Sequence, residues 1–110
     1  RHVPFKLKRV YLIKDCIEGM DRGHHAHKTT DQALFCIQGE VDIYLDNGVE
    51  KEIIHLNSAK NGVFLPARVW HEMRHMKKNT IMLVVASDYY DEKDYIRNYQ
   101  DFLTYIKGNA

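Results

Sequence analysis

The chain contains the stretch Val41-Asp42-Ile43-Tyr44-Leu45-Asp46-Asn47-Gly48, in which apolar and polar residues alternate ahead of a turn sequence. Such alternation is typical of a β-strand that buries one of its two faces. Asn47-Gly48 tolerates the positive φ angles that a tight hairpin turn requires. The stretch therefore predicts a strand and a hairpin, with residues 51–56 as the returning strand.

Short segments rich in β-branched and aromatic residues lie on both sides of this hairpin, and we expect them to be strands as well. They are residues 9–13, 33–37, 62–66, 69–76 and 80–86. Residues 15–23 hold two glycines and several polar residues, so we expect a loop there. About seven or eight short strands with frequent turn signals predict an all-β sandwich or barrel.

The spacing of apolar residues changes near the C-terminus, from Asp91 onward. Acidic residues begin this segment, and Gly108 follows its last apolar residue. These features predict one amphipathic helix over residues 91–107, with its aromatic stripe packed against the core. The residues at helical spacing are Tyr95, Ile96, Tyr99, Phe102, Leu103 and Ile106.

Composition restricts the class of protein. A chain of 110 residues is long enough for a single domain, residues 1–110, and a net charge of +1 gives no reason to expect a nucleic-acid or membrane partner. Cys16 and Cys36 lack CxxC spacing, and we expect both to stay reduced in the cytoplasm. The first residues do not form a signal peptide, and no apolar run is long enough to span a membrane.

The segment Arg22–Lys28 holds three histidines within four positions. On a strand, residues two apart share a face, so His25 and His27 should project together while His24 and Ala26 project to the other side. A pair of imidazoles on one face can bind a metal or act as an acid–base pair. A solvated, histidine-rich loop is the alternative interpretation.

The spacing of this segment resembles the first cupin motif, which normally has a glutamate at the position of Gln32. A weaker likeness to the second cupin motif surrounds His71, with Arg68 where glycine is usual. A cupin jelly roll is also the kind of fold that the strand count predicts. The matching positions are Gly19, His25, His27, Gln32, Gly39, Pro66 and His71.

Five blocks of sequence, in one order, resemble the sugar-nucleotide 3,4-ketoisomerases, the FdtA/WxcM-like cupins. Members of that family act on dTDP-4-keto-6-deoxyglucose in the synthesis of unusual deoxysugars for cell-surface glycans. The resemblance implies a small jelly-roll barrel with one C-terminal helix that forms a homodimer. Family members usually carry an additional N-terminal segment that contributes to the dimer and the sugar pocket, and we expect this chain to lack it. The blocks are Arg22–Lys28, Leu45–Gly48, Val69–Met73, Ala86–Glu92 and Asp94–Phe102.

The reaction that the resemblance implies moves a carbonyl from C4 to C3 of the hexose through an enediol intermediate. Histidine suits this proton transfer, because its unperturbed pKa of about 6.5 allows it to accept and to donate near neutral pH. The resemblance supports His25 and His27 as the catalytic pair, and it leaves open which carbon each serves. The expected substrate-binding residues are Arg22, Lys28 and His71, which could stabilise the enolate oxygen, together with Gln32 and Trp70.

Other roles for these residues stay open. Trp70 or Tyr44 could stack on a thymine ring or pack in the core. His75 follows His71 by four positions, an even spacing that would place both on one strand face and His75 beside the site. His25, His27 and His71 could also bind a metal. Because Gln32 is a poorer ligand than glutamate and the family resemblance argues for metal-independent chemistry, we expect no metal and no cofactor.

Three rival functions remain at this point. One is a metal-dependent cupin enzyme, such as a dioxygenase or a different sugar isomerase. Another is a cupin that binds a sugar nucleotide without converting it. The third is a sugar-nucleotide 3,5-epimerase, for which we expect a His/Tyr/Asp acid–base set that the sequence does not display.

Overall fold

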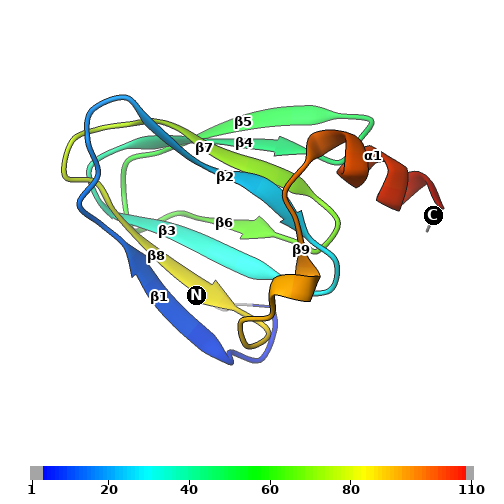
Figure 1. Cartoon of the computed structure of the whole chain (residues 1–110). Helices are drawn as coiled ribbons and strands as arrows, with labels where there is room; N and C mark the ends of the chain where they lie inside the picture. Colours follow the sequence, from blue (N-terminus) through cyan, green and yellow to red (C-terminus); the bar gives the residue numbers. More distant parts are fainter. Residues whose placement is uncertain (1–3, 109–110) are drawn as a thin grey trace.

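The computed structural model describes residues 4–108, and these residues form two antiparallel β-sheets packed face to face (Figure 1). The four-stranded sheet has the order β1-β8-β3-β6, and the five-stranded sheet has the order β5-β4-β7-β2-β9. This arrangement confirms the expected all-β class with one helix at the C-terminus. The strands are β1 (Arg9–Ile13), β2 (Met20–His27), β3 (Gln32–Gln38), β4 (Val41–Asp46), β5 (Lys51–Leu56), β6 (Gly62–Leu65), β7 (Trp70–Met76), β8 (Ile81–Ala86) and β9 (Tyr95–Ile96).

The core lies between the two sheets, where alternate residues of each strand point inward. Leu34 and Val84 on the four-stranded sheet are buried there against Ile43 and Met73 on the five-stranded sheet. The predicted hairpin is present, with Val41 paired to Leu56 and the turn at residues 47–50. The alternation that predicted β4 therefore follows from burial on one face.

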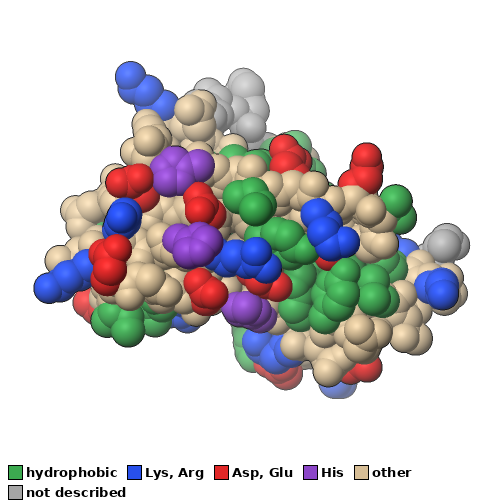
Figure 2. Space-filling view, turned by 90° about the horizontal axis from the view of Figure 1, so that it is seen from above, with side chains coloured by type: hydrophobic (Ala, Val, Ile, Leu, Met, Phe, Trp, Pro, Cys, Tyr) green, Lys and Arg blue, Asp and Glu red, His purple; other side chains and the backbone are tan. Residues whose placement is uncertain are grey.

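The outer faces of the two sheets differ in polarity. Seen from above, the five-stranded sheet carries histidine, acidic and basic side chains intermixed, with hydrophobic side chains gathered beside them (Figure 2). The outer face of the four-stranded sheet instead carries two apolar rows that run from strand to strand in register. One row is Leu12, Leu83 and Phe35, and the other is Val10, Val85, Ala33 and Phe64.

Strand β2 is longer than predicted and contains a β-bulge. It begins at Met20, inside the segment expected to be a loop. Arg22 pairs with Met73 and His25 pairs with His71, so β2 advances three residues while β7 advances two. The extra residue is accommodated at Gly23 and His24, whose φ angles are 93° and 46°. Because of it, Arg22 and His25 both stand opposite inward-facing residues despite their odd spacing.

The helix predicted over residues 91–107 is shorter than expected. The segment starts with a single 3₁₀ turn at Glu92–Asp94, continues as β9, and becomes helix α1 only at Tyr99–Gly108. The physical reason is pairing, since Tyr95 and Ile96 bond to His27 and Ala26 of β2 in place of forming a helical turn. Within residues 4–108, no helix is long and apolar enough to cross a membrane.

Candidate active site

Three histidine rings meet between the sheets, two from β2 and one from β7. The ring centroid of His25 lies 5.1 Å from that of His27 and 4.4 Å from that of His71. His27 and His71 are 3% and 2% exposed, so water reaches them poorly. His24 points to the opposite side of the sheet, where it lies 3.7 Å from Glu72, and Ala26 is buried under α1. The predicted division of these four residues between two faces is therefore present.

His25 is held as a neutral imidazole with a defined tautomer. Its Nδ1 lies 2.7 Å from the carbonyl oxygen of Gly23, and a carbonyl can only accept, so Nδ1 carries the proton. The other nitrogen, Nε2, is buried and has no hydrogen-bond partner among the described residues. Burial is the main cause that lowers the pKa of His25 to about 4. The ring thus presents an unprotonated nitrogen to the interior at neutral pH.

His27 is oriented by a carboxylate. Its Nδ1 donates to Asp94 Oδ2 at 2.8 Å, which leaves Nε2 as the free, buried nitrogen within the described part of the chain. Burial raises the pKa of Asp94, but hydrogen bonds from Thr30, Thr29 and His27 outweigh it and hold this pKa at about 2. Burial lowers the pKa of His27, and Asp94 offsets part of that shift. Asp94 therefore stabilises the protonated form of His27, an advantage that His25 lacks.

His71 completes the set from the neighbouring strand. Burial lowers its pKa well below the usual value, His25 and His27 lower it further, and a hydrogen bond to the backbone of Val69 opposes them. Its Nδ1 has no hydrogen-bond partner in residues 4–108. Three neutral imidazoles, each with one nitrogen free, therefore face the same interior space.

Polar residues of the four-stranded sheet form the opposite wall. Arg9 and Gln32 both pair with Ala86, which puts them in one row across the sheet. Gln32 is 1% exposed and its Nε2 lies 3.3 Å from the hydroxyl of Tyr11. Burial raises the pKa of Tyr11, so this hydroxyl stays protonated. The site therefore lies between two sheets that are otherwise apolar inside.

The rim is formed by the segment around β9. The Tyr95 ring lies 4.4 Å from the His27 ring and 5.0 Å from the His25 ring. Arg97 covers the outer face of Tyr95 at 4.4 Å and forms two hydrogen bonds of 3.0 Å with Glu92. Glu92 also accepts from the hydroxyl of Tyr90. This network shields the histidines on the side where β9 joins β2.

Two of the expected substrate-binding residues lie on the other side of the five-stranded sheet. Lys28 follows the inward-facing His27 and projects outward, where its Nζ lies 5.6 Å from the ring of Tyr105 on α1. Trp70 precedes the inward-facing His71 and is 4% exposed beneath α1, with Nε1 donating to Glu72. Both corrections follow from the two-residue period of a strand. Trp70 is a core residue, one of the two roles considered for it.

Tyr44 and His75 also lie on the outer side of the five-stranded sheet. Tyr44 packs against the buried cluster beneath α1, which is the core role considered for it, and the Arg74 guanidinium lies 4.0 Å from its ring centroid. His75 has a φ angle of 55° at a second bulge, and its 75% exposed side chain bonds to Asp42 on the outer face. Because the bulge adds one residue to β7, His75 points to the opposite face from His71 despite the even number of positions between them. Arg22, in contrast, pairs with Met73, and its charge lowers the pKa of Tyr11, so it lies toward the interior side.

Sequence reasoning missed three residues of the site, which are Arg9, Asp94 and Tyr95. Arg9 and Tyr11 alternate with apolar Val10 and Leu12, a pattern that marks a strand with one polar face. Asp94 and Tyr95 carried no such signal, because both were assigned to the helix. The structure does bring a histidine, a tyrosine and an aspartate together, since His27 bonds to Asp94 and packs against the Tyr95 ring.

The donor set does not fit a metal ion well. In the described residues, no group of three or more histidine, cysteine, aspartate or glutamate side chains is arranged to hold one. The Gln32 amide donates to Tyr11 on the same sheet, on the wall opposite the histidines.

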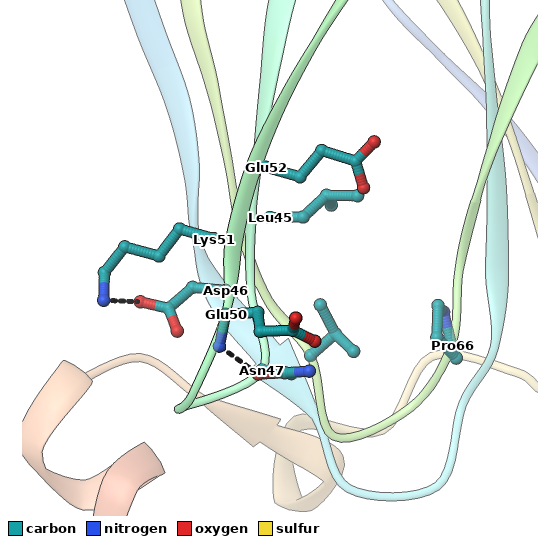
Figure 3. A pocket seen from close by; sticks show the side chains of 8 residues that line it. Leu45, Asp46, Asn47, Glu50, Lys51, Glu52 and Pro66 are labelled. Carbon is teal, nitrogen blue, oxygen red and sulfur yellow. Dashed lines mark hydrogen bonds and ion pairs between the residues drawn. The ribbon is translucent and has the colours of Figure 1, made fainter.

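A separate hollow of about 370 Å³ opens at the other edge of the sandwich, between the β4–β5 hairpin and the segment after β6. Figure 3 shows Leu45 and Glu52 side by side in it, with Pro66 on the opposite wall. The histidines do not line this hollow. The hollow is lined by the carboxylates Asp46, Glu50 and Glu52 and by one ammonium, that of Lys51, and this excess of negative charge would repel a diphosphate. The arginines Arg9, Arg22 and Arg97 lie at the histidine side instead.

The fold defines a cupin-type protein with three histidines gathered between its sheets, and comparison with known proteins identifies its family. The family model described as FdtA, WxcM-like, C-terminal matches residues 1–107. A TDP-4-oxo-6-deoxy-alpha-D-glucose-3,4-oxoisomerase from Aneurinibacillus thermoaerophilus is 44% identical over 106 residues, which cover 96% of this chain and 76% of that protein. The chain belongs to the FdtA/WxcM-like family.

Solved structures agree with this assignment. A 3,4-ketoisomerase from Helicobacter canadensis has a TM-score of 0.92 at 39% identity, over 96% of this chain and 79% of that one. The sugar 3,4-ketoisomerase QdtA from Thermoanaerobacterium thermosaccharolyticum, in complex with TDP, has a TM-score of 0.91 at 41% identity, over 97% and 78%. A mutant of QdtA in complex with TDP-4-keto-6-deoxyglucose has a TM-score of 0.91 at 40% identity, over 96% and 77%.

Proposed function

We propose that this protein is a dTDP-sugar 3,4-ketoisomerase that converts a dTDP-4-keto-6-deoxyhexose to its 3-keto isomer. The observation that carries the proposal is the group of neutral imidazoles with free nitrogens at His25, His27 and His71. An unprotonated imidazole is the group that can take a proton from a carbon next to a ketone. Family membership supports the sugar nucleotide as the substrate.

His27 takes the proton from C3. His25 transfers a proton to C4 and exchanges protons between the neighbouring oxygens. Asp94 supports this division, because its carboxylate stabilises the imidazolium that forms when His27 accepts a proton. His25 has no carboxylate partner and a pKa of about 4, so it gives up any proton that it receives. Tyr95 packs against both rings and keeps them apart from bulk water.

The histidine roles are tested by proton NMR of dTDP-4-keto-6-deoxyglucose in D₂O, using wild type, His25→Asn and His27→Asn. We expect wild type to form a 3-keto sugar with deuterium at C4 and to keep this activity in the presence of a chelator. Each variant should lose about 10²-fold or more in rate. His55→Asn is the matched control, because His55 is exposed on the outer face beside Asp42.

Two results would contradict the proposal. Binding of the sugar nucleotide without conversion would favour a non-catalytic binding protein. Conversion that stops with a chelator would favour a metal-dependent enzyme.

A sugar-nucleotide 3,5-epimerase is a second candidate, since the His27, Asp94 and Tyr95 side chains lie together as the His/Tyr/Asp set expected of one. The same NMR experiment separates the two functions. Such an epimerase would place deuterium at C3 and C5 and leave the ketone at C4. The identity to named ketoisomerases favours isomerisation.

We further propose that the protein acts as a homodimer in the cytoplasm. The apolar rows on the outer face of the four-stranded sheet support self-association, since Val10, Leu12 and Phe64 are 57%, 53% and 42% exposed there. Cys16 and Cys36 are free and buried, which suits a reducing compartment.

A further inference from the structure

Arg9 is a charged residue whose hydrogen bonding is incomplete. It opens β1 and alternates with Val10, so its side chain faces the interior with that of Tyr11. Its Nε atom is buried and has no hydrogen-bond partner in the described residues 4–108. Leaving a buried donor unpaired costs about 1–3 kcal/mol, and more when the group is charged. A fold retains such a donor where a ligand provides the acceptor.

The guanidinium is held by aromatic rings and not by a carboxylate. It lies 5.2 Å from the ring centroid of Tyr11 and 5.7 Å from that of Tyr90. None of the ion pairs within the described residues includes Arg9, whereas Arg97 pairs with Glu92. Stacking fixes the plane of the group while it leaves the N–H donors available.

Arg9 also faces the histidines across the site. Its guanidinium packs against Tyr11, and its positive charge lowers the pKa of both His27 and Tyr11. The row that it shares with Gln32 belongs to the four-stranded sheet, and the three imidazoles belong to the five-stranded sheet. A hexose between the sheets would have the bases on one side and the guanidinium on the other.

We propose that Arg9 is a catalytic residue that donates hydrogen bonds to the enediolate oxygens of the hexose. This inference rests on the proposed isomerase function. When His27 removes the C3 proton, the C3–H electron pair forms the C3=C4 bond and the carbonyl π electrons move to O4. The O3 proton then passes to O4, so that the negative charge moves to O3. Return of a proton to C4 re-forms a carbonyl at C3, so no oxidant or reductant is consumed.

Arg9 suits this task better than Lys28 or Arg22, the two cations expected from the sequence. Lys28 points away from the histidines, and Arg22, although it stands opposite the inward-facing Met73, is exposed to solvent. The planar guanidinium offers several N–H donors, so it can follow the charge from O4 to O3 without moving. Donors placed in advance at a developing oxyanion act most strongly where water is excluded.

The test compares wild type, Arg9→Gln, Arg9→Lys and Lys8→Gln on dTDP-4-keto-6-deoxyglucose. Lys8→Gln removes the same charge one residue away, where the Lys8 ammonium lies over Tyr89. We expect Arg9→Gln to lower kcat by about 10²–10³-fold while the Kd for dTDP, measured by calorimetry, stays within about threefold. Arg9→Lys should fall between wild type and Arg9→Gln, and Lys8→Gln should keep its kcat. The isotope effect with C3-deuterated substrate should rise in Arg9→Gln, because proton removal becomes rate-limiting.

The outcomes separate this inference from the function on which it rests. A wild-type protein that does not isomerise the substrate overturns the proposed function and the role of Arg9 with it. An active wild type with a kcat for Arg9→Gln within threefold of its own overturns the role of Arg9 alone, whatever happens to the Kd. Circular dichroism and a melting curve check that each variant folds. If Arg9→Gln does not fold, Arg9→Lys decides the question, and a kcat equal to that of wild type in this variant overturns the role of Arg9.

Discussion

Each histidine of the site is a basic group that the fold keeps uncharged, and this has a consequence for stability. The pKa of His25 is lowered from 6.5 to about 4, mainly by burial, and the pKa values of His27 and His71 are lowered in the same direction. Between pH 6.5 and pH 4, the unfolded chain therefore binds more protons at these histidines than the folded chain does. The stability that the folded protein gains by keeping them neutral is present in full above pH 6.5 and is lost as the pH falls toward 4.

The free energy of unfolding should thus fall between pH 7 and pH 4.5, with a contribution of up to about 3 kcal/mol from His25. Urea unfolding at a series of pH values measures it, and His25→Asn should show a shallower dependence. Protonation of Asp94 lowers the free energy of unfolding only below its usual pKa of 3.8. The pKa of exposed His55 is raised by Asp42, so this histidine weakly stabilises the folded protein as the pH falls. A stability that is flat over this range would contradict the burial of neutral imidazoles.

Asp94→Asn tests the carboxylate behind His27. The amide keeps the shape but removes the charge that raises the pKa of His27. We expect kcat to fall by about 10²-fold, and the acid limb of the kcat/KM profile to move to lower pH, because the His27 imidazolium loses its partner. Asp91→Asn, on the same segment, is the control. An unchanged acid limb would show that Asp94 does not set the pKa of the base.

At the scale of the element, the bulge in β2 decides which side chains enter the site. Gly23 has a φ angle of 93°, and a Cβ there would lie 3.3 Å from Glu72 Cα and 3.3 Å from the carbonyl oxygen of His71. The Gly23 carbonyl also orients His25. The bulge thus links the backbone conformation of β2 to the orientation of the His25 ring.

Gly23→Ala should destabilise the protein by about 1–3 kcal/mol, because alanine is strained at a positive φ and its methyl group would crowd the backbone of β7. Activity should fall further than stability alone accounts for, as the His25 ring loses its orientation. Thermal melts and kcat measured well below the melting temperature distinguish the two effects. Gly19→Ala, also at positive φ but with no heavy atom within 4 Å of the added Cβ, is the matched control.

Helix α1 is attached to the back of the five-stranded sheet by a buried carboxylate. Asp46 is 1% exposed and accepts from the Tyr99 hydroxyl at 2.6 Å and from the Gly48 amide at 2.7 Å. The hydrogen bond to Asp46 raises the pKa of Tyr99 to about 12. Since only two residues separate α1 from β9, this bond also fixes the segment that carries Asp94 and Tyr95.

Tyr99→Phe should cost about 1–3 kcal/mol of stability, because it leaves Asp46 short of a donor. Amide hydrogen exchange should become faster in α1 and β9 while the four-stranded sheet keeps its protection. Tyr89→Phe, whose ring is 67% exposed, should change neither quantity. Faster exchange throughout the molecule would argue against a local role for the bond.

At the scale of the whole molecule, the contrast between the two outer faces predicts the interface. The five-stranded sheet presents charged groups on the face seen in Figure 2 and carries α1 (Figure 1). The opposite face, on the four-stranded sheet, carries the two apolar rows. Burying such rows against a second copy removes apolar surface from water, which is worth about 25 cal/mol per Å². A two-fold dimer through this face would leave the polar outer face free.

Light scattering coupled to size exclusion should therefore show a dimer for wild type and a monomer for Leu12→Glu or Phe64→Glu. Ile53→Glu is the control, since Ile53 is equally exposed, at 61%, but lies on the outer face of the other sheet. A wild-type monomer, or dissociation caused by Ile53→Glu instead, would contradict the proposed interface.

Prediction from the sequence worked where local patterns decide the structure. Alternation gave the strands, Asn47-Gly48 gave the hairpin, and the two-residue period placed His25 and His27 on one face. It was wrong for residues 91–98, where helical spacing favoured a helix but pairing of β9 with β2 prevailed. It was also wrong for His75, because a bulge changes the parity of a strand and leaves no clear mark in the sequence.

The sequence by itself determined the fold class, the family and the histidine pair, since each depends on local patterns that recur along the chain or on spacing within one segment. Only the tertiary structure decided what the histidines face. Arg9, from β1, and Asp94, from beyond β8, come to His25 and His27 because the two sheets pack together and β9 pairs with β2. The physical reason is that hydrophobic burial and strand pairing join residues distant in the chain, and local sequence carries little record of those contacts.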